Sequence, residues 1–138
     1  MITNALIKIL NELLQININR IEYYKHLLNE AKDMELDVKA IFQRMIEESI
    51  KYKQELNEKI NQLGGTPETG AAASGNIYKK WADGKTAVIS GYKKTILEAC
   101  EYDEEAVQNA YRAALSSDAT MDADVLEIIK KQLQNFKD

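Results

Sequence analysis

Apolar residues recur at helical spacing in four long stretches of this chain, and the connections between them are short, long and short. The stretches are residues 2–32, 35–63, 92–116 and 121–137, and residues 64–91 form the long connection. Apolar residues three and four positions apart share one side of an α-helix, so each stretch predicts a helix with one buried face. A short link makes the two helices that it joins antiparallel neighbours. The pattern predicts an all-α protein made of two helical hairpins.

The long connection distinguishes between the ways of stacking two hairpins. It starts at Gly64 and Gly65, contains the only proline, and continues into a weaker apolar stripe of Ile77, Trp81 and Val88. A bundle whose helices simply alternate up and down has no need of so long a link. In a ferritin-like four-helix bundle, by contrast, such a crossover runs the length of the bundle. We therefore predict a single ferritin-like domain over residues 1–138, with a short helix in the crossover and Ser117 or Thr120 capping the last helix.

Composition narrows the classes of function. The 138 residues carry a formal net charge of -4, which argues against a general nucleic-acid binder. Cys100 is the only cysteine, so an intramolecular disulfide is excluded and a cytoplasmic location is the simplest expectation. No stretch has the roughly 18 consecutive apolar residues that a membrane-spanning helix needs, and no signal peptide is expected.

Each predicted helix carries polar residues in or beside its apolar stripe. Counted from the first turn, residues 17 and 48 are equally distant, and residues 104 and 132 are equally distant from the second turn. The pattern therefore predicts one polar layer at mid-bundle. Its expected members are Asn17, Arg20, Glu48, Ser49, Glu104 and Gln132, with Glu101 and Asp103 on the two flanks of the third helix.

Two hypotheses explain such a layer. In the first, hydrogen bonds and an ion pair of Arg20 with Glu48 or Glu104 fix the register of the helices. In the second, the carboxylates bind a cation such as Fe, Mn or Zn. A di-metal carboxylate bundle also takes a Glu-x-x-His pair from two of its helices. Since no such pair is present, we expect no cofactor and retain metal binding as the alternative.

The remaining reactive side chains have structural interpretations. His26 and Glu22 project away from the apolar stripe, Cys100 is expected to be a small buried residue, and three tyrosines are expected in the core with their hydroxyls near the polar layer. These tyrosines are Tyr24, Tyr52 and Tyr111. The crossover is locally basic through Lys79, Lys80, Lys85, Lys93 and Lys94, which form a solvated face or a site for an anionic partner. No phosphate-binding loop or catalytic triad can be assembled, so we expect a non-enzymatic protein.

Several stretches together resemble a bacterial ferritin-like four-helix-bundle family of unknown function, of the domain-of-unknown-function 2383 type. They are LNELLQ (10–15), EAKDMELDVKAIFQRM (30–45), KYKQELNEKINQLGGTPE (51–68), Trp81 and ILEACEYDEEAVQNAYRAAL (96–115). The resemblance implies a bundle with a long crossover, and recurrent glutamates that match Glu48, Glu101 and Glu104. It implies no known activity, and Arg20 stands where the family usually has a small residue.

Three functional hypotheses follow. The first is a non-enzymatic bundle that acts through a homo-oligomer or a protein partner. The second is a metal-binding or oxidative-stress protein that uses Glu48, Glu101 and Glu104. The third is an anion- or nucleic-acid-binding surface on the basic crossover.

Overall fold

All secondary structure in the described part of the chain is helical. The computed structural model describes residues 2–30, 36–68, 75, 77–82, 96–117 and 119–137; at residues 2, 3, 30, 36–38, 96–100 and 137 it describes the backbone only. Four long helices are present, α1 (Ile2–Glu30), α2 (Leu36–Gln62), α4 (Ile96–Leu115) and α5 (Ala123–Lys137). Residues 77–82 form a short helix between α2 and α4.

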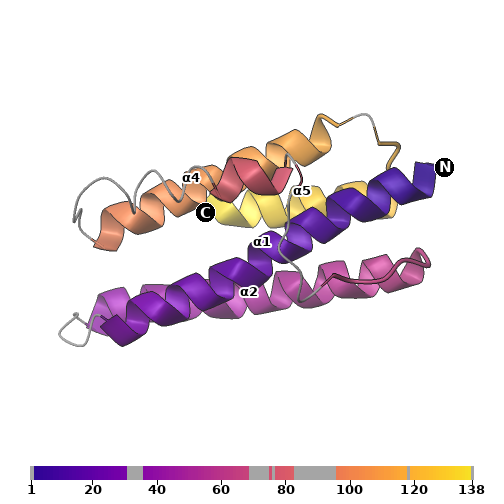
Figure 1. The fold of residues 1–138 in the computed structure, drawn as a ribbon. Coiled ribbons are helices and arrows are strands. Elements are labelled where there is room, and N and C mark those ends of the chain that lie inside the picture. Colours follow the sequence, from indigo (N-terminus) through magenta and orange to yellow (C-terminus); the bar gives the residue numbers. More distant parts are fainter. Residues whose placement is uncertain are drawn as a thin grey trace.

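The long helices pair in the order of the chain. α1 lies antiparallel to α2, and α4 lies antiparallel to α5 (Figure 1). α1 also contacts α4, and α2 contacts α5. α2 and α4 run in the same direction, so the end of α2 and the start of α4 lie at opposite ends of the molecule (Figure 1). The short helix at residues 77–82 lies in the sequence between these two ends.

The core forms one large cluster and a small second one. The large cluster takes side chains from all four long helices and from Ile77 and Trp81. The small cluster, formed by Tyr24, Phe42 and Met45, lies toward the turn between α1 and α2. The buried residues of the large cluster include Leu6, Leu10, Leu13, Leu14, Ile16, Tyr52, Leu56, Ile60, Ala106, Val107, Ala110, Tyr111, Ala114, Val125, Ile129, Leu133 and Phe136.

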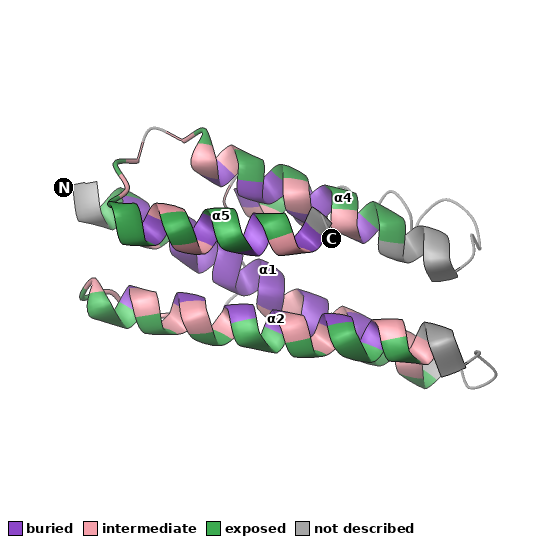
Figure 2. Ribbon diagram, turned by 180° about the vertical axis from the view of Figure 1, so that it is seen from behind, coloured by how far each residue is buried: buried purple, intermediate pink, exposed green. Residues whose placement is uncertain are grey.

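α1 is the most enclosed helix. All its residues from Ile9 to Asn17 are buried, including the polar Asn11, Glu12 and Gln15, and the middle of α1 has the colour of buried residues (Figure 2). These three side chains hold the crossover. Asn11 accepts a hydrogen bond from the Glu68 amide and donates one to the Thr66 carbonyl, and Gln15 donates to the Glu68 carbonyl. The polar face of α1 is thus covered by backbone rather than by water.

The helix ends agree with the predicted ones to within a few residues wherever they are described. α2 ends with Gly64 at φ +83°, and the Gly65 amide bonds to the Ile60 carbonyl, which satisfies a carbonyl that the helix leaves open. Parts of the predicted first and third helices, at residues 31–32 and 92–95, lie outside the described residues.

The cap of α5 differs from the prediction. Asp122 caps this helix, because its carboxylate accepts a hydrogen bond from the Val125 amide at 2.9 Å. Ser117 instead donates to the Ala114 carbonyl at the end of α4. The expectation of Ser117 or Thr120 as the cap was wrong, because an aspartate directly before the helix supplies the same acceptor two residues later than Thr120.

None of the helices in the described ranges is long and apolar enough to cross a membrane.

Candidate functional site

The centre of the molecule is organised around Asp103, a fully buried carboxylate on α4. Arg20 Nε donates to Asp103 Oδ2 at 3.0 Å, and the Tyr24 hydroxyl donates to the same oxygen. The indole Nε1 of Trp81 donates to Oδ1 at 2.5 Å. α1 and the short crossover helix therefore both attach to α4 through this one side chain.

The Arg20 guanidinium is as buried as its partner. Besides Asp103 it donates to Ser49 Oγ at 3.0 Å, and its Cζ lies 4.9 Å from the centroid of the Phe136 ring and 5.5 Å from that of Tyr24. Burial, the largest single effect, would by itself lower the pKa of Arg20, but the charges of Asp103 and Tyr24 and the hydrogen bonds to them together outweigh burial, so the pKa is raised. The guanidinium is thus a permanent positive charge held between an acid and two aromatic rings.

A second polar chain crosses the molecule beside this pair. Asn17 Nδ2 donates to the Tyr111 hydroxyl at 3.0 Å, and that hydroxyl donates to Gln132 Oε1 at 2.5 Å. Gln132 Nε2 donates in turn to Glu55 Oε1 at 3.0 Å. Burial raises the pKa of Tyr111, so its hydroxyl keeps its proton at neutral pH. The chain joins all four long helices, and within the described residues one buried side-chain oxygen, Asn17 Oδ1, has no hydrogen-bond partner.

Glu48 and Glu104 lie together at the edge of the helical core. They line one pocket of about 210 Å³ with Arg44, Met45 and Asn135. Both carboxylates are half-buried, and loss of water raises the pKa of each above its ordinary value. The charge of Arg20 acts in the opposite direction on both. This pocket therefore holds a mutually repelling acid pair beside a buried cation.

The sequence-predicted metal residues are only partly together. Glu48 and Glu104 share the pocket, whereas Glu101 is exposed. Among the described side chains, no three His, Cys, Asp or Glu residues are grouped as metal ligands. Two carboxylates with guanidinium groups beside them are a poor donor set for a cation. The residues of this chain alone do not fit a preformed Fe, Mn or Zn site.

Four of the six residues predicted for the polar layer are buried, and each of these four makes a hydrogen bond. They are Asn17, Arg20, Ser49 and Gln132. The other two, Glu48 and Glu104, are half-buried. The expected partner of Arg20 was wrong, because Arg20 pairs with Asp103 rather than with Glu48 or Glu104. The buried face of α4 runs through Ala106 and Ala110 as well as Val107 and Tyr111, which turns Asp103 inward and Glu104 to the edge.

The other singled-out side chains divide into described and undescribed groups. Tyr24, Tyr52 and Tyr111 are buried, and His26 and Glu22 are exposed, as expected. Lys79 and Lys80 are exposed on the short helix. The side chain of Cys100 and residues Lys85, Lys93 and Lys94 lie outside what the structure describes.

Sequence reasoning missed three residues that build the site. Asp103 was placed on a flank, Trp81 was treated as part of a weak stripe and of the family resemblance, and Glu12 was not singled out. Glu12 Oε1 accepts hydrogen bonds from the amides of Ile77 and Tyr78 at 3.1 and 3.3 Å, and so caps the short helix that carries Trp81. For Asp103, the sequence did contain a signal in the small alanines at 106 and 110, which lie on the same buried face of α4. Such small residues mark a close contact between helices but contribute little to a hydrophobic stripe.

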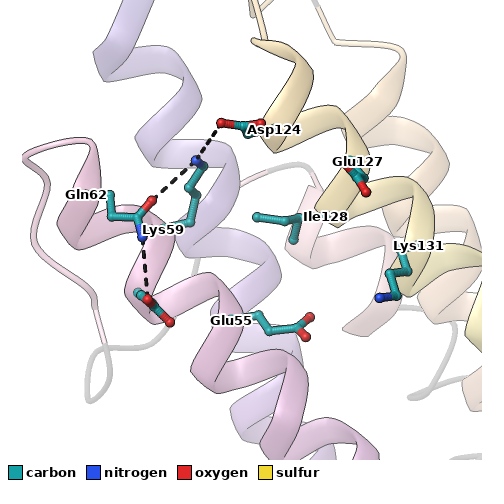
Figure 3. A pocket seen from close by; sticks show the side chains of 8 residues that line it. Glu55, Lys59, Gln62, Asp124, Glu127, Ile128 and Lys131 are labelled. Carbon is teal, nitrogen blue, oxygen red and sulfur yellow. Dashed lines mark hydrogen bonds and ion pairs between the residues drawn. The ribbon is translucent and has the colours of Figure 1, made fainter.

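A groove lies between the long helices α2 and α5. Figure 3 shows this groove of about 350 Å³, in which Ile128 projects between charged side chains of both helices. Lys59 lies 3.9 Å from Asp124 across it and also donates to Gln62 (Figure 3). Glu55, the outer end of the buried polar chain, reaches the groove from α2. The groove is a charged surface feature and contains no nucleophile and base in contact.

Comparison with known proteins places the chain in a family without assigning an activity. No curated protein and no solved structure matches the chain. The sequence model of one family matches residues 5–117, a range that contains Arg20, Trp81, Asp103 and most of the contacts described above. The chain belongs to the family described as Domain of unknown function (DUF2383).

Proposed function

We propose that this chain is a ferritin-like four-helix-bundle protein that performs no catalysis and acts by self-association. Two antiparallel hairpins whose middle helices run in the same direction support the ferritin-like arrangement, because this topology needs a lengthwise crossover (Figure 1). The function is then carried by the outer surfaces of the helices.

One observation carries the non-catalytic part of this proposal. The centre of the bundle, where a carboxylate protein of this class holds its cations, contains the Arg20 guanidinium bonded to Asp103 and Ser49. Asp103 accepts bonds from three donors on two elements, so its oxygens are committed to the fold. A charge pair satisfied in this way fixes helix register and leaves no group to react.

Sedimentation velocity over a hundredfold range of protein concentration tests the self-association. We expect the sedimentation coefficient to rise with concentration and the rise to diminish at high salt. A monomer at every concentration and ionic strength would overturn the proposal.

Metal binding is the second candidate, and one observation favours it. Glu48 and Glu104 come from different helices and line the same pocket with Asn135. The remaining ligands would be waters or groups from a second copy. Elemental analysis after incubation with Fe, Mn or Zn, together with melting curves, tests this candidate. Metal below one ion per chain and an unchanged melting temperature would exclude it.

Anion binding by the crossover is a third, lesser candidate. Lys79 and Lys80 are exposed on the short helix and support it. Binding of duplex or single-stranded nucleic acid that falls steeply with salt is the expected signature. Absence of binding at low salt would remove this candidate.

A further inference from the structure

We propose that two copies of this chain pair through the outward face of α5, with the two α5 helices antiparallel and Glu127 of each copy beside Lys130 of the other. This inference rests on the proposed self-association and names the surface that carries it. The geometry of one helix, its charge order and a hollow over it are the three observations behind it.

The outward face of α5 is a continuous exposed stripe. Ala123, Glu127, Lys130 and Gln134 are all exposed and follow one another at helical spacing. A shallow hollow of about 580 Å³ lies on this face, lined by Ala123, Leu126, Glu127, Lys130 and Lys131. Leu126 is half-buried and is not packed against the main core cluster, so this face has an apolar contact to offer.

The charges of α5 are ordered along its axis. Asp124 and Glu127 occupy its first half, and Lys130 and Lys131 its second half. In an antiparallel pair centred between residues 128 and 129, Glu127 of each copy faces Lys130 of the other, and Ala123 faces Gln134. A parallel pair would place like charges together. The charge order therefore selects the antiparallel arrangement, in which the two helix dipoles are also opposed.

A second copy is the occupant that this face fits best. A two-fold contact uses the same patch on both subunits, so the patch must be complementary to itself when reversed. The α5 stripe meets this condition, since reversing it exchanges acid for base.

The charges that would form the contact are available. In the part of the chain that the structure describes, neither Glu127 nor Lys130 makes a hydrogen bond or ion pair. One 15-residue helix per copy is a smaller contact than a standard stable interface. We therefore expect a weak dimer that depends on ionic strength.

Charge exchange tests the pairing. Glu127→Lys and Lys130→Glu each turn two attractive contacts into repulsive ones, and each is expected to weaken dimerisation by about tenfold in sedimentation equilibrium at low salt. An equimolar mixture of the two variants is expected to form a heterodimer about as tight as the wild-type dimer, because every contact is then attractive again. The double variant is expected to dimerise like the wild type.

Glu47→Lys on α2 is the matched control, because it makes the same change of charge on an exposed helical residue outside the stripe. It should leave the dimer unchanged. Circular dichroism checks that all variants keep their helix content. If the wild type dimerises but the two single variants dimerise equally well, or if mixing them restores nothing, the α5 interface is wrong while self-association stands. If the wild type is a monomer throughout, the proposed function itself fails.

Discussion

Asp103 and Glu104 are adjacent on α4 and lie in two different electrostatic regions. Asp103 is fully buried and accepts bonds from Arg20, Tyr24 and Trp81. Glu104 is half-buried beside Glu48, and no donor of comparable quality compensates its lost water, so its pKa is raised. The deeper carboxylate is therefore the better satisfied one. Donors, rather than depth, decide whether an acid in a helical core stabilises the fold or strains it.

The two regions also differ in their access to solvent and ligands. The Asp103 region is closed, with each donor supplied by the chain itself. The pocket of Glu48 and Glu104 is open to solvent. Because their pKa values are raised, these two side chains bind a proton at a higher pH than ordinary carboxylates do. Three substitutions and one pH series test the contrast, in order of decreasing expected effect.

Asp103→Ala should have the largest effect. It leaves the Arg20 charge buried without its counter-ion, which costs about 3–5 kcal/mol of unfolding free energy. Glu104→Ala is the matched control at the next position and should cost less than about 1 kcal/mol. Urea unfolding measures both. If Asp103→Ala does not fold, Asp103→Asn, which keeps one acceptor for Trp81, provides the comparison; equal costs at positions 103 and 104 would contradict the contrast.

Trp81→Phe should have the next largest effect. Phenylalanine keeps much of the apolar volume but removes the N–H that bonds Asp103 Oδ1, leaving that oxygen unsatisfied at a cost of about 1–3 kcal/mol. Because Trp81 is the only tryptophan, Asp103→Asn in the wild-type background should also shift its fluorescence. An unchanged emission spectrum in Asp103→Asn would show that the indole does not sense this carboxylate.

Gly75→Ala should destabilise the attachment of the crossover. A Cβ at residue 75 would overlap the Glu12 carboxylate that caps the short helix. Displacing this cap costs about 0.5–2 kcal/mol. Gly64→Ala is a useful comparison, since there a Cβ would meet no atom within 4 Å and the cost comes from φ +83° alone. If Glu12→Ala removes the effect of Gly75→Ala, the overlap is its cause; additive effects would reject that cause.

The pH dependence of stability should show the smallest effect. The pKa values of Glu48 and Glu104 are raised above the ordinary 4.5, so their protonated forms favour the folded state. Their contribution is fully present below pH 4.5 and is lost as pH rises through the raised values. Glu48→Gln with Glu104→Gln should therefore flatten the decline in stability above pH 4.5 in thermal melts at a series of pH values. An equal decline in wild type and variant would place the titration elsewhere.

Much of the fold was predictable because it depends on local pattern. Helical spacing located the four long helices, and Gly64 and Gly65 located the end of α2. The membership of Asn17, Arg20, Ser49 and Gln132 in the interior was predictable for the same reason, since each falls in an apolar stripe.

The identity of the buried acid was not predictable in this way. The predicted apolar stripe of α4 passed through Ile96 and Cys100 and therefore included Glu104. The observed buried face follows the alanines at 106 and 110 instead, and this turns Asp103 inward. The roles of Glu12 and Trp81 depend on partners 65 and 22 positions away. Such pairings arise only when the crossover is laid on α1 and α4, and no local spacing encodes them.

The Glu12 cap has a consequence for the order of folding. Residues 77–82 make up fewer than two turns, and so short a helix does not persist alone in water. Its first carbonyl acceptor is Gly75, which has no side chain to satisfy the open amides, and Glu12 of α1 supplies that acceptor instead. This helix is therefore expected to form only after α1 has folded and residues 77–82 have packed against α1. The hydrogen-exchange rates of the Ile77 and Tyr78 amides therefore measure how often the short helix detaches from α1.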